Sequence, residues 1–370
     1  MKRFPLTVMV ILIIAAVAYA GGSTTATGVS RQMNPAISLN ALFHGQWNDD
    51  TPTGDENFIK LQEAEIQFTS VVDPFWTADV VLAFHPAHAH EGEEAHGLET
   101  DIELAALQST FMPAGFGLTL GKFFVPFGKH AVLHTHQMPF TKAPLAQNII
   151  LGDHGLKEVG ALLEYTVPLP WWSDLSVYGI NGDSEIFDAG DRDPVLGAHW
   201  SNLWDVSDGG TLEIGGSYLN GPSALHEDVA GTLDVMGLDV TWKWESISRS
   251  HGPAAQISAE LLLSDAEQGE GDPRGWFVHG QTRFHRNWWI GLGYGRMDDA
   301  VEHHHDADKE DTHSLADWQE MKAALTFVSS EFSSMRAEVS RVEEIDGDAS
   351  DLRVSVQWNF TIGSHPAHLY

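Results

Sequence analysis

The 370-residue sequence has no cysteine and few basic residues. Without cysteine the chain has no disulfides, no thiolate catalysis and no lipidated cysteine of the kind that anchors a bacterial lipoprotein. Only 20 lysine and arginine residues stand against 52 acidic ones, a formal charge of −32, which argues against nucleic acid as a partner. Serine-hydrolase, phosphate-loop and zinc-protease motifs are also missing, so the sequence gives no reason to expect an enzyme.

The only long apolar run lies at the N-terminus, within a segment that has the three parts of a secretory signal peptide. Lys2 and Arg3 form its basic start, residues 6–18 its apolar run, and Ala18-Tyr19-Ala20 the small residues of a cleavage site. The run is shorter than the ~20 residues that span a bilayer, which disfavours an uncleaved anchor helix. We predict a signal peptide at 1–20, a short segment at 21–35 and a mature chain of net charge −34.

The mature chain contains many segments in which apolar and polar residues alternate, a pattern typical of β-strands. In the clearest, residues 352–362, every second residue from Leu352 to Ile362 is apolar and the residues between are polar. Segments 159–167 and 236–244 repeat the pattern, which predicts 15 to 16 strands. The other strands are expected to begin near residues 37, 59, 75, 102, 118, 175, 212, 255, 276, 290, 321 and 335.

Strands with one apolar and one polar face occur in soluble sandwiches or propellers and in membrane barrels. Three features favour the barrel: strands of about 10 residues, alternating short and long connections, and aromatic residues at strand ends, such as Trp171-Trp172. We predict an all-β transmembrane antiparallel barrel of about 16 strands at 36–370, without a second domain, in the cell outer membrane. Its long extracellular loops are expected at 86–99, 127–156, 181–196, 221–233, 265–274 and 299–316.

Two of these loops are rich in histidine and acidic residues. Imidazole and carboxylate groups bind Zn²⁺, Ni²⁺ and Cu²⁺, and a flexible loop can fold around a metal. The sequence therefore indicates weak capture of zinc or another divalent cation, with incidental histidines on a hydrophilic surface as the alternative and no required cofactor. The candidate ligands are His85, His88, His90, Glu93, Glu94, His96, His303, His304, His305, Asp306 and His313.

Five stretches carry a family resemblance: Val72-Asp73-Pro74-Phe75, 121–128, His134-Thr135-His136-Gln137, 151–157 and the tail 362–370, which ends in Tyr370. In these stretches the chain resembles porin-like outer-membrane proteins of the phosphate-selective porin type, and within them the zinc-regulated outer-membrane protein group. The resemblance implies a channel for small solutes or ions that forms a homotrimer. It also implies two partners, outer-membrane lipid and the barrel-assembly machinery that reads the C-terminal strand.

The acidic, histidine-rich loops depart from the basic pore walls for which phosphate-selective porins are known, which puts phosphate selectivity in doubt. Some relatives are labelled TonB-dependent receptors, so a surface metal-binding receptor without open conductance is the alternative function. Such receptors resemble a larger barrel closed by an N-terminal plug. The segment 21–35 is too short to form that plug.

In porins one long loop commonly folds into the lumen, and the segment 129–157 is the candidate for such a constriction, with an external cap as the alternative. Its candidate residues are His130, His134, His136, Lys142, Asp153 and His154. Alternation also predicts charged side chains on the lumen wall, where they would tune ion selectivity or pair with one another. These candidates are Glu63, Glu65, Lys122, Glu158, Glu164, Asp239, Lys243, Arg283, Arg336 and Arg353.

Overall fold

The computed structural model describes residues 35–48, 59–86, 97–153, 155–188, 193–224, 231–247, 252–267, 272–304 and 312–363, with only the backbone described at 301–304 and 312–314. Sixteen strands in these ranges form one closed antiparallel sheet, which confirms the predicted barrel. They are β1 (Ala36–Asn48), β2 (Lys60–Asp73), β3 (Trp76–Pro86), β4 (Leu98–Ser109), β5 (Phe116–Phe124), β6 (Lys157–Thr166), β7 (Trp172–Ile180), β8 (Val195–Ser207), β9 (Gly210–Pro222), β10 (Thr232–Glu245), β11 (Ala254–Ala266), β12 (Arg274–His285), β13 (Trp288–His304), β14 (Thr312–Ser330), β15 (Ser333–Glu344) and β16 (Ser350–Gly363).

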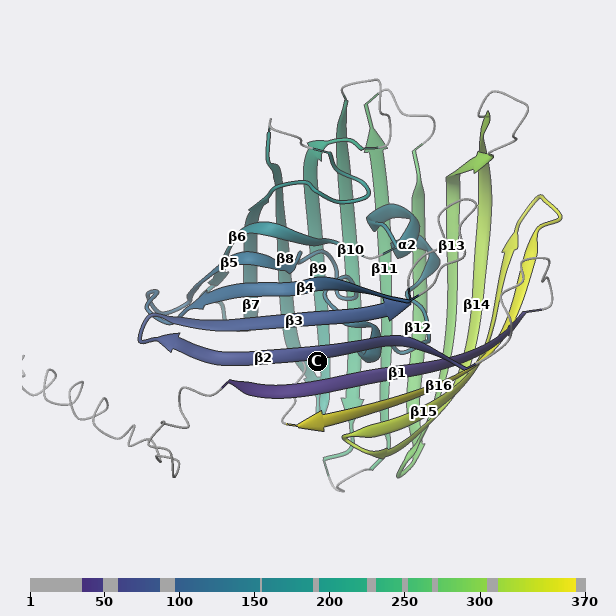
Figure 1. Cartoon of the computed structure of the whole chain (residues 1–370), viewed down its shortest axis with the longest axis horizontal. Helices are drawn as coiled ribbons and strands as arrows, with labels where there is room; N and C mark the ends of the chain where they lie inside the picture. Colours follow the sequence, from purple (N-terminus) through teal and green to yellow (C-terminus); the bar gives the residue numbers. More distant parts are fainter. Residues whose placement is uncertain are drawn as a thin grey trace, which may run out of the picture.

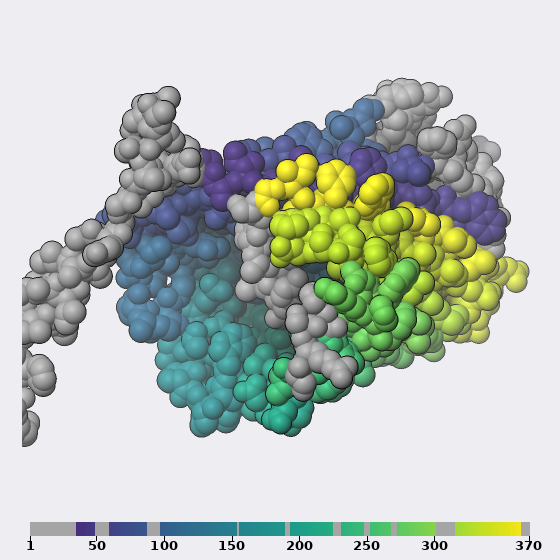
Figure 2. Space-filling view, turned by 90° about the horizontal axis from the view of Figure 1, so that it is seen from below, coloured from purple at the N-terminus to yellow at the C-terminus, as the bar shows by residue number. Residues whose placement is uncertain are grey.

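The barrel closes where β1 pairs with β16. In register, Ser38 lies opposite Gly363 and Asn48 opposite Arg353, and the Asn40 side-chain amide donates to Asn359 Oδ1 at 2.8 Å. In Figure 2, seen from below, purple residues of β1 lie beside yellow residues of β16. The strands of the front wall cross those of the back wall steeply in Figure 1, as the tilt of a closed barrel requires.

Apolar side chains lie on the outside of the barrel and polar side chains on the inside, which is the reverse of a water-soluble protein. On β16, Val354, Val356 and Trp358 are 41–52% exposed, whereas Ser355 and Gln357 between them are 3% and 4% exposed. The other strands also turn large apolar side chains outward, among them Leu238 and Leu292. An apolar outer face around a polar interior is the arrangement that a lipid environment selects.

This arrangement predicts how an arginine on the outer face should act. Val356→Arg, near the middle of β16, should lower the free energy of unfolding by about 2–4 kcal/mol, because its charge would lie in the hydrocarbon. Ile362→Arg, at the end of the same strand, should cost only about 0–1 kcal/mol. Urea titrations of barrels refolded into phosphatidylcholine vesicles measure both. Equal costs at the two positions would contradict a lipid-facing outer wall.

Two details differ from the sequence-based expectation. The expected strand starts omit β8, because the polar Asn202 on its outer face and the apolar Leu203 on its inner face interrupt the alternation. The expected loop 299–316 is shorter, because β13 and β14 stay paired as far as His304 and Thr312. Both strands continue through the polar, histidine-rich sequence, which alternation of apolar residues could not detect.

The longest connection, between β5 and β6, runs through residues 125–156 and is here called the inserted segment. It contains a 3₁₀ turn at Thr135–Gln137 and the helix α2 at Leu145–Leu151, which packs against β11, β12 and β13 (Figure 1). Phe127, Ile150 and Leu151 of this segment join a buried apolar cluster with Leu262, Met297 and other inward-facing strand residues. No helix among the described residues is long and apolar enough to cross a bilayer.

Candidate functional site: the lumen and its inserted segment

The two ends of the inserted segment lie side by side. The Val125 backbone N–H donates to the Leu156 carbonyl at 2.9 Å, which continues the β5–β6 hairpin by one more pair. Between these ends the chain crosses the interior and contacts inward-facing residues on three parts of the wall, carried by β9–β12, by β2 and β4, and by β14–β15. The segment therefore occupies part of the lumen.

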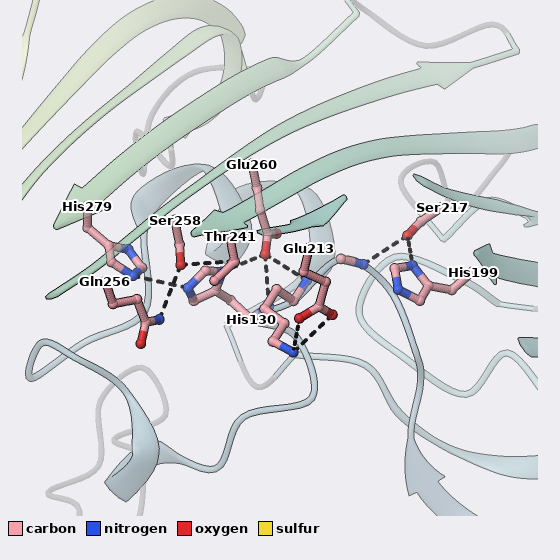
Figure 3. A network of polar contacts seen from close by, with 11 residues as sticks. His130, His199, Glu213, Ser217, Thr241, Gln256, Ser258, Glu260 and His279 are labelled. Carbon is pink, nitrogen blue, oxygen red and sulfur yellow. Dashed lines mark hydrogen bonds and ion pairs between the residues drawn. The ribbon is translucent and has the colours of Figure 1, made fainter. Parts of the chain in front are cut away.

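The first attachment, at Gly128–His130, contacts β9, β11 and β12 (Figure 3). Glu260 on β11 accepts hydrogen bonds from the backbone N–H groups of Lys129 and His130 at 2.8 and 2.9 Å, and its Oε1 lies 2.5 Å from His130 Nδ1. His130 Nε2 lies 3.2 Å from His279 Nε2 on β12. Both histidines and Glu260 are almost completely buried, so this end of the segment is held tightly.

Charge and backbone conformation support the same attachment. The Lys129 ammonium donates to both carboxylate oxygens of Glu213 on β9, at 3.0 and 2.8 Å. Gly128 has a φ of 60°, and a Cβ there would lie 2.6 Å from a carboxylate oxygen of Glu260. Glycine is therefore required on both counts, because any other residue would meet backbone strain and a collision.

The second attachment joins the 3₁₀ turn to the opposite part of the wall. His134 Nδ1 lies 3.3 Å from Glu65 Oε1 on β2 and 3.5 Å from Glu103 Oε2 on β4, and His136 Nδ1 lies 3.3 Å from Glu65 Oε2. Lys157, at the start of β6, pairs with Glu103. Burial opposes protonation of His134, but hydrogen bonds and charges from Glu103 and Glu65 outweigh it and raise the pKa of His134 to about 10.

The third attachment precedes α2 and uses β14 and β15. Glu338 on β15 accepts from the Thr141 backbone N–H at 2.8 Å and from its hydroxyl at 2.9 Å. Lys322 on β14 donates to the carbonyls of Lys142 and Ala143 at 3.1 and 3.0 Å. In addition, Arg336 donates to the Met138 carbonyl at 2.9 Å. Burial and the nearby Arg353 guanidinium lower the pKa of Lys142.

Of the candidate constriction residues, His130, His134 and His136 make the contacts just described, and Lys142 contributes its carbonyl. Asp153 is exposed, and its backbone N–H donates to the Glu185 carboxylate at 2.8 Å. His154 lies outside the described residues. The structure therefore brings the first four candidates against the lumen wall, whereas Asp153 contacts Glu185 in the connection between β7 and β8.

The candidate lumen charges, with one exception, share the inner face of the barrel. Glu63, Glu65, Glu158 and Asp239 are at most 8% exposed. The strand register places the other inward-facing candidates opposite inner-face neighbours: Glu164 opposite Gly117, Lys243 opposite Gln256, Arg283 opposite Ala254, Arg336 opposite Gln357 and Arg353 opposite Ser340. Arg283 pairs with Glu245, and Arg353 pairs with Asp351.

Lys122 is the exception. It lies opposite Val159, which is 46% exposed, and it therefore belongs to the outer row that also contains Leu118 and Leu120. The expected lumen position was wrong for this residue, because alternation from Leu118 already places even-numbered residues of β5 outside. Its ammonium reaches Asp101 at 3.3 Å.

Most of the candidate metal ligands in the outer loops lie outside the described residues: His88, His90, Glu93, Glu94, His96, His305 and Asp306. His85 lies near the end of β3, with Nδ1 3.4 Å from the Pro86 carbonyl oxygen. The backbones of His303 and His313 are paired across β13 and β14.

Sequence reasoning missed several residues that hold the inserted segment, notably Glu213, Glu260, Lys322 and Glu320. Each lies on the polar face of an alternating strand. Glu320 on β14 accepts from the Leu145 backbone N–H at 3.2 Å. For Glu260 the signal was present, because Gln256, Ser258 and Glu260 alternate with Ile257, Ala259 and Leu261. Alternation shows that such a carboxylate faces inward but not which loop residue it will meet.

No protein-family model matches the chain. A sequence relative, an uncharacterised protein of Aquifex aeolicus, is 24% identical over an alignment 369 residues long. The alignment covers 90% of this chain and 74% of the relative.

Among solved structures, the anion-selective porin from Comamonas acidovorans has a TM-score of 0.58 at 10% identity, covering 89% of this chain and 100% of that one. The outer-membrane channel DcaP of Acinetobacter baumannii has a TM-score of 0.56 at 14% identity, covering 92% and 99%. A loop-deletion mutant of OmpT, an outer-membrane protein of Vibrio cholerae, has a TM-score of 0.57 at 10% identity, covering 89% and 99%. The chain thus has the porin-like β-barrel fold of these outer-membrane proteins.

Proposed function

We propose that the protein is a passive outer-membrane channel for small hydrophilic solutes and ions, narrowed by its inserted segment. The observation that carries the proposal is the crossing of the lumen by residues 125–156, which charged residues of the wall hold at three attachments. A barrel of this strand number has room for an aqueous passage, and a segment fixed inside it sets the passage width.

The fold and the apolar outer face support an outer-membrane location. The alternation of short and long connections supports an orientation of the barrel in that membrane. On one end of the barrel the connections are mostly short, as between β2 and β3, β8 and β9, and β12 and β13; on the other they are longer. In outer-membrane barrels the short turns are periplasmic and the long loops extracellular. One solved structure of Vibrio cholerae OmpT is described as a trimer, and we extend a homotrimeric assembly to this chain.

The acidic composition favours cations over anions and over phosphate. The negative charge of the chain raises the local concentration of cations at the mouth and in the lumen. The structurally similar Comamonas porin is described as anion-selective. The fold alone therefore does not determine ion selectivity, which depends on the residues of the lumen wall. We therefore propose that the outer loops with His85–His96 and His303–His313 concentrate divalent metal such as zinc at the mouth.

Reversal potentials in planar bilayers test the channel and its selectivity. Under a KCl gradient, the refolded protein should pass K⁺ over Cl⁻ by about threefold or more, since a negative lumen potential of only about half a kT per unit charge enriches K⁺ and depletes Cl⁻ enough for this ratio. Asp239→Asn should reduce this ratio, because it removes an inward-facing carboxylate whose two oxygens lack a hydrogen-bond partner among the described residues. Glu331→Gln, the same charge change in the β14–β15 turn, should leave the ratio unaltered.

Two outcomes would count against the proposal. An absence of conductance from correctly folded barrels would favour the receptor alternative, and a preference for anions would contradict the acidic vestibule. Folding is checked by gel migration, because a folded barrel runs differently before and after boiling.

A further inference from the structure

Two imidazoles and a carboxylate meet where the inserted segment touches β2. The Glu65 carboxylate lies between the two rings, with Oε1 3.3 Å from His134 Nδ1 and Oε2 3.3 Å from His136 Nδ1. Ligand atoms of the three residues all lie within 4.8 Å of one another. Glu103 Oε2 approaches His134 Nδ1 to 3.5 Å from the neighbouring wall. We call these four residues the His134–Glu65 cluster.

The distances from Glu65 to the two rings are longer than usual for charge-assisted hydrogen bonds and fit the separation of two ligands on one metal. Charge-assisted hydrogen bonds between nitrogen and carboxylate oxygen are about 2.7–2.9 Å long. In a tetrahedral zinc site with bonds of about 2.0–2.1 Å, neighbouring ligand atoms are separated by about 3.3–3.4 Å. The same segment provides the contrast, since His130 Nδ1 lies only 2.5 Å from Glu260 Oε1, within direct hydrogen-bonding distance.

The carboxylates around the cluster also favour binding of a cation. Glu63, Glu65 and Glu103 are buried together, and Lys157 is the ammonium that pairs with them through Glu103. Oε2 of Glu63 is buried without a hydrogen-bond partner among the described residues, and Oε2 of Glu103, also buried, has His134 Nδ1 at 3.5 Å. A divalent cation here would offset the negative charge that the three carboxylates bring together. Uncompensated buried charge is costly, so the group favours the cation.

We propose that the His134–Glu65 cluster binds one divalent transition-metal cation of the Zn²⁺ class, with His134, His136 and Glu65 as ligands and Glu103 as the fourth. Two imidazole nitrogens select zinc, cobalt or nickel over Mg²⁺ and Ca²⁺, which prefer oxygen ligands. The imidazole ligands bind as neutral rings. This site is separate from the outer histidine-rich loops, and its existence does not depend on whether the barrel conducts.

The four proposed ligands come from different parts of the chain, so a bound metal would connect those parts. His134 and His136 belong to the inserted segment, Glu65 to β2 and Glu103 to β4. A metal bound to all four would therefore cross-link the segment to the wall at its second attachment.

Titration with Co²⁺, whose visible absorption reports four-coordinate binding, tests the site in the full refolded barrel. The outer-loop histidines His85, His88, His90, His96, His303, His304, His305 and His313 are first replaced by glutamine to give a background variant. This variant should bind one equivalent of Co²⁺ with intense tetrahedral bands, and Zn²⁺ but not Mg²⁺ should displace it. In this background His136→Gln and Glu65→Gln should each weaken binding by more than about tenfold.

His199→Gln is the matched control. His199 is an inward-facing histidine on β8 whose Nδ1 lies 2.8 Å from Ser217 Oγ, and its replacement should leave the Co²⁺ titration unaltered. Folding of every variant is verified by heat-dependent gel migration. If Glu65→Gln does not refold, the Co²⁺ titration of His136→Gln decides whether the site exists. A folded background variant that binds no Co²⁺, or binding that survives both ligand substitutions, would overturn the site. Since the readout is metal binding, conduction without Co²⁺ binding would refute the metal site alone.

Discussion

Deleting the inserted segment should raise the single-channel conductance by at least about twofold, since a barrel of sixteen strands leaves an aqueous passage when nothing crosses it. The change can be made with little strain, because Val125 and Leu156 are already hydrogen-bonded to each other. A four-residue linker of glycine, asparagine and serine in place of 127–154 should close the β5–β6 hairpin. Planar-bilayer recordings of the refolded barrel give the measurement.

A matched control keeps this result specific. The shorter connection 345–349 between β15 and β16 can be replaced by a glycine-serine linker of equal length, which should leave the conductance unchanged. Equal conductance for the native and the deleted barrels would show that residues 125–156 do not limit the passage. Lower conductance after deletion, in barrels that pass the gel test, would mean that the segment holds the lumen open.

Glu260→Ala should release the first attachment of the inserted segment. Glu260 accepts two backbone N–H groups and lies against the His130 ring, all buried, so its removal leaves several donors without an acceptor. We expect a loss of about 3 kcal/mol or more in the local attachment, which corresponds to about a 100-fold faster exchange of the Lys129 and His130 amide protons. Hydrogen–deuterium exchange followed by mass spectrometry on peptides covering 127–133 measures this loss.

Glu245→Ala serves as the comparison for Glu260→Ala. Glu245 also pairs with a basic side chain, Arg283, but its side chain is 62% exposed at the end of β10. Solvent screening limits such a pair to about 0–1 kcal/mol, so exchange in 127–133 should remain native. If Glu260→Ala also left exchange in 127–133 native, Glu260 would not hold the segment. Glu260→Gln, which retains an acceptor oxygen, should fall between the two.

Alternation was sufficient to predict the architecture because each side chain of a membrane barrel has one of two environments. Val354, Val356 and Trp358 face outward as expected, and the strands predicted from 159–167 and 236–244 are β6 and β10. The failures are local. Asn202 and Leu203 reverse the pattern in β8, and the sequences Glu302-His303-His304 and Thr312-His313-Ser314 at the ends of β13 and β14 are polar at consecutive positions. Backbone pairing continues through such residues because hydrogen bonds of the ladder do not depend on side-chain polarity.

The candidate site could be predicted only as a list of residues and not as contacts. The length and the histidines of 129–157 pointed to the correct segment. The partner of His130 is Glu260, 130 positions away, and the partner of Thr141 is Glu338, 197 positions away. Such pairs depend on the curvature of the whole barrel and on strand register, which a single sequence does not encode as a local pattern.

The closure of the barrel at β1 and β16 has a consequence for how the chain can fold. Asn40 meets Asn359 and Thr361 across sequence separations of 319 and 321 residues, so the first strand has its second partner only after the entire chain has been exported. Contacts of such long range make folding slow and cooperative. A chain truncated before β16 would expose two unpaired strand edges in an apolar environment, where backbone groups find no water. Release of incomplete chains should therefore lead to aggregation or degradation rather than to smaller barrels.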